Sequence, residues 1–252
     1  MPGVDSMSLP FACLFQATIT SQMIHPQDYL AHVKFIFREK GDPERAQGQR
    51  WYTRHQFEFY GLKAPEWMAL AKEIFTEKGI PEEENLKTFA RLCYDDEYRE
   101  IHYFGTETVQ RELKKQPEDF ILLLEELITT KSWWDTVDWL AKLVGIHFKK
   151  YPHLILPVTE RWMASENFWL QRVCLIFQLS YKVKTDFELM KKYILQLAGS
   201  KEFFIQKGAG WALRQYSKTD PNGVVDFIEN HPQLASLTRR EGLKWLKNQG
   251  KL

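Results

Sequence analysis

The sequence predicts an all-α protein in which antiparallel helix pairs stack into a solenoid, and three observations lead to this fold class. From Pro26 onward, apolar residues recur at helical spacing, and short breaks that contain proline or glycine separate the helical segments. No segment shows the sustained alternation of apolar and polar residues that would indicate a strand. Similar aromatic motifs also recur every 35 residues in the second half of the chain, which indicates an internal repeat.

Proline and glycine mark the ends of the helices in the first half. Pro43 and Pro65 suit the first turn of a helix, and Gly61 and Gly79 suit the position after the last turn. The predicted helices cover residues 26–41, 43–61, 65–79, 85–93, 97–115 and 117–129.

The repeat is carried by Trp134, Trp169 and Phe204, each near the start of a predicted helix that follows a short polar break. A second helix fits into each interval, at about residues 152–163 and 187–197. Two helices in about 35 to 45 residues are typical of a HEAT-like α-solenoid. One row of helices in such a stack lines a concave face. We expect the helices that begin near residues 132, 166 and 201 to form that row.

The length of the chain fits one solenoid domain, which we expect to span residues 26–252 of the 252. Residues 1–25 precede the first predicted helix and lack the basic segment that opens a secretion signal. We therefore expect a flexible N-terminal leader and no export. No apolar run approaches the length of a transmembrane helix.

Cysteine and histidine usage predicts a cytoplasmic protein without a metal site. The three cysteines, Cys13, Cys93 and Cys174, lie far apart and form no C-x-x-C pair. This spacing favours a reducing compartment over a disulfide framework or a thiolate zinc site. The seven histidines are scattered and match no zinc-ligand motif. The fold class needs no second chain, so we expect a monomer.

Charge is distributed unevenly along the chain, although the net charge is only +1. Residues 131–252 hold 19 Lys and Arg against 11 Asp and Glu, whereas residues 1–130 hold 15 against 22. A basic C-terminal half favours a polyanionic partner, although such a half can also simply balance an acidic one.

The nine residues from Lys131 to Trp139 combine three tryptophans with two aspartates at the predicted start of a helix. Trp134 and Asp138 are four residues apart and share one face of that helix. Because an unpaired buried carboxylate is costly, an indole beside a carboxylate suits a cleft better than a dry core. Such a cleft would bind a flat, positively charged ligand. The alternative is that the tryptophans belong to the core and that the aspartates cap the helix or face solvent.

The other two helices of the expected concave row supply basic and aromatic residues. Arg172 lies on the second helix, and Lys207, Trp211 and Arg214 lie on the third. Arginine and lysine suit DNA phosphates by charge and hydrogen bonding, whereas indoles suit a sugar or a base. These residues predict a basic DNA-binding face.

Two glycines, Gly208 and Gly210, stand beside Trp211 in the third helix. Glycine is a poor helix former, so a ligand or a neighbouring backbone is expected to approach closely there. Tight packing between helices is the simpler explanation.

Three motifs occur in one order along the second half of the chain. They are K-S-W-W-D-T-V-D at residues 131–138, W-L-Q-R at 169–172, and S-K-E-F-F-I-Q-K at 200–207, followed by G-W at 210–211. This set resembles the AlkD-like DNA alkylation repair family, whose members are HEAT-repeat DNA glycosylases that release cationic alkylated purines. The resemblance covers about residues 26–249. A weaker match is W-Y-T-R at 51–54, followed by F-Y-G at 59–61.

The resemblance implies duplex DNA with alkylated purines as the partner. In that family the residues at Trp134, Asp138, Arg172 and Trp211 line the DNA cleft, and those at Tyr52 and Arg214 contact the DNA. Lys207 joins the DNA-binding set because of its charge. Asp138, Trp134 and Trp211 are expected to be catalytic. The residues expected to bind DNA are Arg172, Tyr52, Lys207 and Arg214.

The chemistry of alkylated purines agrees with these roles. Alkylation at N3 of adenine or N7 of guanine makes the base a cationic leaving group, and positive charge then develops on the sugar. Asp138 would stabilise that charge and orient water, while the indole rings would pack on the sugar. This reaction needs no metal and no redox cofactor. The alternatives are a solenoid that binds DNA structures without catalysis and a protein-binding scaffold.

Overall fold

The computed structural model describes residues 25–251, and these residues form thirteen α-helices joined by short connections. No β-strand occurs in this range, which contains only an isolated bridge between Glu58 and Tyr98. None of these helices is long and apolar enough to cross a membrane. The predicted leader lies outside the described residues, except for His25 just before the first helix. The helices are α1 Pro26–Lys40, α2 Pro43–Tyr52, α3 Ala64–Lys78, α4 Glu83–Asp95, α5 Arg99–Glu112, α6 Ile121–Thr129, α7 Trp134–Lys150, α8 Ile155–Ala164, α9 Phe168–Ile176, α10 Phe187–Gln196, α11 Phe203–Tyr216, α12 Pro221–Asn230 and α13 Ser236–Asn248.

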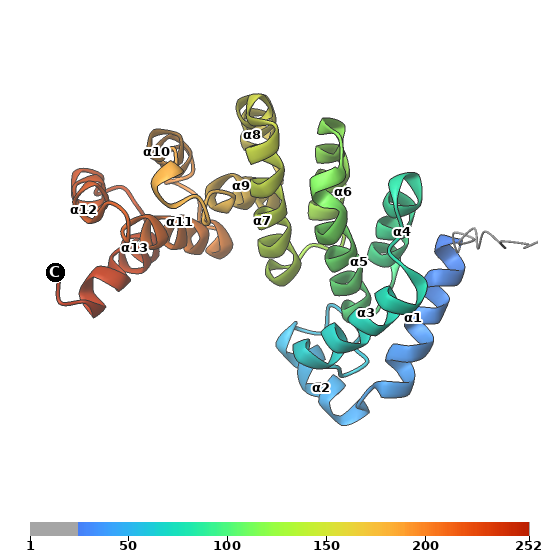
Figure 1. Ribbon diagram of the computed structural model, residues 1–252. Helices are drawn as coiled ribbons and strands as arrows, with labels where there is room; N and C mark the ends of the chain where they lie inside the picture. The colour runs from blue at the N-terminus through green and yellow to red at the C-terminus, as the bar shows by residue number, and fades with distance from the viewer. Residues whose placement is uncertain (1–24, 252) are drawn as a thin grey trace, which may run out of the picture.

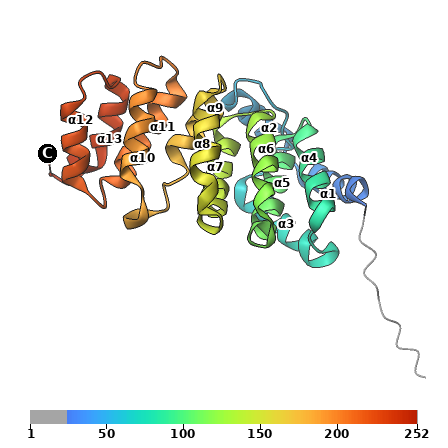
Figure 2. The same ribbon diagram turned by 90° about the horizontal axis from the view of Figure 1, so that it is seen from above.

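The helices alternate between two rows that curve together into an arch. Figure 1 shows α4, α6, α8, α10 and α12 along the outer side and α5, α7, α9, α11 and α13 along the inner side. Consecutive helices of the inner row pack directly against each other, from α5 to α13. Seen from above, the helix pairs follow one another from one end of the molecule to the other (Figure 2). The predicted all-α solenoid is therefore confirmed.

The repeat predicted from the aromatic motifs matches the inner row of helices. α7, α9 and α11 begin close to the predicted residues 132, 166 and 201, and α8 and α10 fill the intervals between them. Local capping explains two of these starts. The side chain of Asn167 accepts a hydrogen bond from the backbone N–H of Trp169 at 2.9 Å, and Glu202 accepts one from Phe204 at 3.3 Å.

One predicted element is wrong in its length, because α2 ends at Tyr52 instead of near Gly61. Arg54 and the residue after it have φ values of 57° and 59°, a left-handed conformation that stops the helix. The backbone N–H groups of residues 60–62 then donate to the buried carboxylate of Glu100 at 2.9 to 3.1 Å. A tertiary contact thus replaces the helical hydrogen bonds that the sequence pattern predicted.

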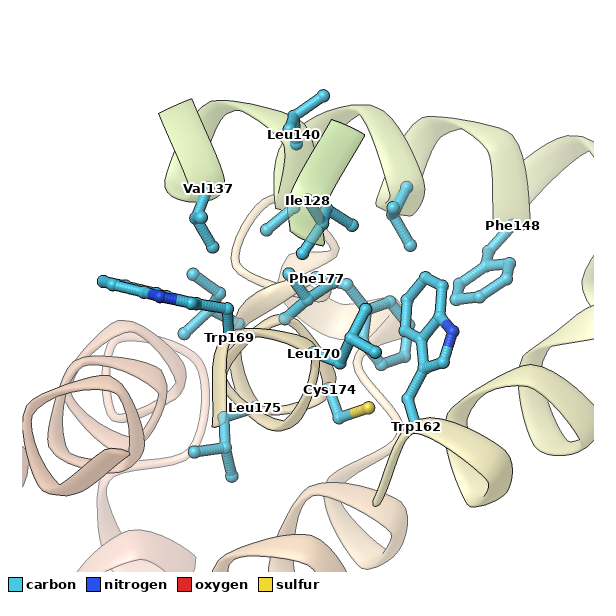
Figure 3. Packing of buried hydrophobic residues seen from close by; sticks show 14 of the residues in the cluster. Ile128, Val137, Leu140, Phe148, Trp162, Trp169, Leu170, Cys174, Leu175 and Phe177 are labelled. Carbon is cyan, nitrogen blue, oxygen red and sulfur yellow. The ribbon is translucent and has the colours of Figure 1, made fainter. Parts of the chain in front are cut away.

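Most of the buried apolar side chains form one core that continues from repeat to repeat. Figure 3 shows Val137 and Leu140 of α7 above Trp169 and Leu170 of α9, with Trp162 of α8 at the side. All five side chains are buried. A second cluster fills the space among α1, α3, α4 and α5. The inner row of helices therefore packs on a continuous apolar core.

A buried arginine connects two consecutive repeats. Arg99 of α5 donates through Nε and Nη2 to the carboxylate of Asp135, and through Nη1 to the carbonyl oxygen of Lys131 at 2.9 Å. The hydroxyl of Tyr103 donates to the same carboxylate at 2.6 Å. Burial raises the pKa of Asp135, but the charge and hydrogen bonds of Arg99 outweigh this effect and hold the pKa below its ordinary value. Because Asp135 lies in the first turn of α7, the network fixes the position of that helix.

Gly210 allows α11 and α13 to pack closely. A Cβ atom at this position would lie 2.5 Å from the Cβ of Glu241 and 2.9 Å from the carbonyl oxygen of Thr238. A Cβ at Gly208 would lie 3.0 Å from Nη1 of Arg172. Packing within the protein, the simpler of the two explanations, therefore accounts for both glycines.

We predict that Gly210→Ala lowers the free energy of unfolding by about 1 to 3 kcal/mol, because the added methyl group overlaps backbone of α13. The matched control is Gly48→Ala in α2, where an added Cβ has no neighbour within 4 Å. That change should raise stability by about 0.5 to 1 kcal/mol, because alanine is the better helix former. Urea unfolding measures both changes. A Gly210→Ala protein as stable as the wild type would contradict the packing argument.

We also predict that Arg99→Met costs about 3 to 5 kcal/mol of stability, because it leaves the carboxylate of Asp135 buried without its cation. Arg91→Met, which breaks the exposed pair with Glu126, should cost about 1 kcal/mol or less. Adding Asp135→Asn to the Arg99 variant should recover part of the loss. Thermal and urea unfolding test this ranking, and equal losses for the two arginine variants would refute it.

Candidate active site

The two adjacent tryptophans at the start of α7 have different surroundings. The ring of Trp133 packs against Trp169 and Phe204, with ring centroids 6.2 and 5.3 Å away. Trp134 is half-buried and packs edge-on against Tyr52 of α2, at 6.1 Å between centroids. The first tryptophan therefore joins neighbouring repeats, and the second remains accessible at the surface.

Tyr52 and Trp134 line a cleft of about 360 Å³ between α2, α5 and α7, which we call the Tyr52 cleft. Tyr52 is 63% exposed. The single carboxylate among the lining residues is that of Asp135, which is paired with Arg99. The Tyr52 cleft thus offers aromatic rings to a ligand, whereas its one carboxylate is already paired. Its lining residues are Arg45, Gly48, Gln49, Tyr52, Thr53, Phe59, Tyr103, Trp134 and Asp135.

Asp138, one turn further along α7, forms a bidentate ion pair with Arg172 of α9. Nε of Arg172 donates to Oδ1 at 2.7 Å, Nη2 donates to Oδ2 at 2.9 Å, and Nη1 donates to the carbonyl oxygen of Phe204 at 2.5 Å. The side chains of Arg172 and Asp138 are 4% and 16% exposed. Arg172 thus uses three of its five N–H groups inside the protein to hold Asp138 and the start of α11. Its predicted contact with a DNA phosphate stays a prediction.

Asp138 shares a second cleft with Trp211, of about 470 Å³, which we call the Asp138 cleft. α7 supplies Asp138 and Lys142, and α11 supplies Trp211 and Gln215. Two of the three predicted catalytic residues therefore line one cleft. The third, Trp134, lies one turn before Asp138 on α7 and lines the Tyr52 cleft. The remaining residues of the Asp138 cleft are Ile176, Phe177, Leu179, Ser180 and Lys182.

The environment of Asp138 changes its acidity in two opposing ways. Burial raises its pKa, whereas the hydrogen bonds and positive charge of Arg172 lower it. The negative charge of Asp135 adds to the rise, and the pKa remains above the ordinary aspartate value. Arg172 therefore offsets part of the cost of keeping a buried carboxylate ionised beside Trp211.

Lys207 and Arg214, two of the predicted DNA-binding residues, both pair with a carboxylate of α13. Nζ of Lys207 lies 2.7 Å from Oε1 of Glu241, and Nη1 of Arg214 lies 2.8 Å from Oε2. Glu241 is buried. Burial raises the pKa of this glutamate, but the two cations outweigh that effect and hold it below its usual value. Their predicted role in DNA binding is not tested by these contacts.

Sequence reasoning did not identify Lys142, Gln215 and Lys182 as residues of the Asp138 cleft. Lys142 follows Asp138 by four residues, and Gln215 follows Trp211 by four, so helical spacing could have identified both. Lys182 lies in a 3₁₀ segment between α9 and α10, where no spacing rule applies.

Trp139, next to Asp138 in sequence, lines neither cleft. Its Nε1 donates to Oε1 of Gln110 at 2.9 Å, and its ring lies 6.1 Å from that of Trp67. The side chain therefore packs toward the N-terminal repeats.

Between residues 25 and 251, no group of three or more His, Cys, Asp or Glu side chains is arranged to hold a metal ion. Cys93 and Cys174, the cysteines in this range, are buried and unpaired. The Asp138 cleft presents one carboxylate, one indole and two amines around an apolar floor. This arrangement suits a ligand that develops positive charge beside the carboxylate and carries an anionic group for the amines.

The chain is similar to known proteins in sequence and in fold. Residues 34–246 match the family model of the DNA alkylation repair enzymes. No curated protein matches the chain. The structure is similar to that of a predicted DNA alkylation repair enzyme from Enterococcus faecalis, with a TM-score of 0.77 and 34% identity, over 82% of this chain and 96% of that one. AlkD2 from Streptococcus mutans shares the fold, with a TM-score of 0.61 and 17% identity, over 88% and 98% of the two chains.

The family model covers most of the chain, including every motif on which the resemblance was based. The resemblance is thereby confirmed: the chain belongs to the DNA alkylation repair enzyme family, and its role is in the repair of alkylated DNA.

Proposed function

We propose that this protein is a DNA glycosylase that hydrolyses the N-glycosidic bond of cationic alkylated purines in duplex DNA. The expected lesions are of the 3-methyladenine and 7-methylguanine type. The observation that carries the proposal is the position of Asp138, which Arg172 holds in a cleft shared with Trp211. Family membership supports alkylated DNA as the substrate.

The proposed reaction assigns Asp138 to the charge that develops on the sugar. As the C1′–N bond breaks, its electron pair moves to the base and neutralises the cationic purine. The deoxyribose then carries oxocarbenium character, which a preorganised carboxylate stabilises. Water adds at C1′, and Asp138 orients it and can accept its proton. Because the base leaves as a neutral molecule, the reaction requires no general acid, metal or redox cofactor.

The indoles and Arg172 have supporting roles in this mechanism. Trp211 lies in the Asp138 cleft, where its ring can pack on the sugar and stabilise its positive charge. Trp134 lies one turn before Asp138, in the Tyr52 cleft, and is proposed to contact the sugar from that side. Arg172 donates to both oxygens of Asp138. Each oxygen keeps a lone pair for water or the sugar. Arg172 is thus a positioning residue for the carboxylate, in addition to its predicted phosphate contact.

Residues that take no part in bond cleavage are also proposed to contact the DNA. Tyr52, exposed beside Trp134, and the side chains of Lys207 and Arg214 are the proposed contacts from the two ends of the site. The protein is proposed to act as a monomer inside the cell, where its substrate occurs.

We predict that Asp138→Asn lowers the rate of base release by about 10²-fold or more, because it removes the charge that stabilises the transition state. The assay measures free 7-methylguanine or 3-methyladenine released from methylated duplex DNA in single turnovers at saturating protein. The matched control is Asp226→Asn, an exposed aspartate of α12, which should act like the wild type.

Three outcomes are decisive. Release by the wild type and the control, but not by the Asp138 variant, would support the mechanism. Release by all three proteins would remove Asp138 from it. DNA binding without release by any protein would favour a non-catalytic DNA-binding solenoid.

We further predict that the midpoint of the acid limb of the pH–rate profile lies at a higher pH than the pKa of an ordinary aspartate. In Arg172→Met this midpoint should move to a still higher pH. Asp138 must be ionised to act, and its folded-state pKa is already raised. Removing the Arg172 cation eliminates the interaction that lowers this pKa, so activity is lost earlier as pH falls. Single-turnover release as a function of pH measures the limb, after subtraction of spontaneous depurination.

The control for this profile is Arg161→Met, which breaks an exposed pair with Glu125 and should leave the limb in place. An Arg172→Met profile that coincides with the wild type would show that the ion pair does not tune Asp138.

A further inference from the structure

A second hollow adjoins the Asp138 cleft along α11. This hollow measures about 390 Å³ and shares Leu179, Lys182 and Gln215 with the Asp138 cleft. The two cavities adjoin at these three residues, and we call them together the lysine trough. The further residues of the second hollow are Gln178, Val183, Thr185, Met190, Ala212, Tyr216, Lys218 and Thr219.

Three lysines line this trough, and none of them forms an ion pair with a carboxylate of residues 25–251. Lys142 has only a long hydrogen bond, from Nζ to Gln110 at 3.4 Å, and Lys218 donates to Oε1 of Gln215 at 2.8 Å. All three lysines, Lys142, Lys182 and Lys218, are exposed. The trough therefore presents three positive charges that the protein does not neutralise.

Negative charge is almost absent from the trough. Among its lining residues, Asp138 is the single carboxylate, and Arg172 already pairs with it. The predicted DNA-binding cations Lys207 and Arg214 share the carboxylate of Glu241. Lys142 and Lys182 are therefore the cations of the Asp138 cleft that no carboxylate of residues 25–251 neutralises.

We infer that the lysine trough binds the phosphodiester backbone of the DNA strand beside the nucleotide that faces Asp138. This inference rests on the proposed function, because it takes DNA as the partner. Lysine ammonium groups bind phosphates as point charges and without sequence preference, as a repair enzyme requires. Lys142 lies one turn from Asp138 on α7, so a phosphate held there fixes the neighbouring sugar against the carboxylate.

The apolar floor agrees with this orientation. Ile176, Phe177 and Leu179 lie between the walls formed by α7 and α11. A deoxyribose can pack on this floor while its phosphates reach the lysines on either side. Free phosphate alone would gain nothing from such a surface.

The test compares two triple variants of the full chain that remove the same number of positive charges. The trough variant is Lys142→Ala, Lys182→Ala, Lys218→Ala, and the control variant is Lys72→Ala, Lys114→Ala, Lys184→Ala. Lys184 belongs to the same 3₁₀ segment as Lys182 but does not line the trough, so it is a matched neighbour. Fluorescence anisotropy measures the affinity for an unmodified duplex over a range of salt concentrations.

We expect the slope of log K against log salt to decrease by about 0.9 for each phosphate that the protein no longer neutralises, or about 2.7 for the trough variant. The control variant should keep the wild-type slope. A third variant that replaces the trough lysines with arginine should restore the slope, which excludes misfolding as the cause. Equal slopes for the wild type and the trough variant, equal decreases for the trough and control variants, or no duplex binding by the wild type would overturn the inference.

Base release separates this inference from the proposed function. The trough variant should need more protein than the wild type to saturate the release of methylated base, because it binds the DNA more weakly. If no protein releases base and the slope still decreases only in the trough variant, the trough binds DNA and the glycosylase proposal fails. If all proteins release base with unchanged slopes, the glycosylase proposal stands and the trough inference fails.

Discussion

The buried side chain of Arg172 connects three consecutive helices of the inner row, and the site is built around this contact. Its guanidinium binds Asp138 of α7 and the carbonyl oxygen of Phe204 at the start of α11, while the residue itself belongs to α9. A charge with 4% exposure requires partners, because an unpaired buried cation is very costly. The hydrogen bonds by which Arg172 joins the repeats therefore also hold the carboxylate of Asp138 in a defined place. Stability and the proposed chemistry share one ion pair.

Ion pairs join α5 to α7, α7 to α9 and α11 to α13 in the inner row. Arg99 pairs with Asp135, 36 residues later, and Lys207 pairs with Glu241, 34 residues later. Arg172 and Asp138 are also 34 residues apart. These separations correspond to the solenoid period, because residues one period apart meet where stacked helices touch. Several charged residues that look like surface ligands in the sequence thus act partly or wholly as connections in the stack. The three lysines of the lysine trough, by contrast, have no carboxylate partner among residues 25–251.

The fold was predictable because its signals are local. Helical spacing and the proline and glycine breaks depend on neighbours within a few residues, and the starts of α7, α9 and α11 agree with them. The prediction failed at α2, where the backbone of residues 60–62 binds Glu100, about 40 residues away. In the candidate site, too, local spacing predicts some features and tertiary contacts decide others. Helical spacing places Trp134 and Asp138 on α7, but the pair with Arg172 depends on the contact between α7 and α9.

The sequence by itself determined the all-α solenoid, its period and the family, together with the residue types available for the site. These properties follow from local periodicity and from motifs that are contiguous in the chain. The tertiary structure decided which of those residues meet. It placed Trp133 among the rings of Trp169 and Phe204, brought Asp138 and Trp211 into one cleft, and paired Lys207 and Arg214 with Glu241. The physical reason is that burial and ion pairing depend on the packing of helices distant in sequence, which no local pattern encodes.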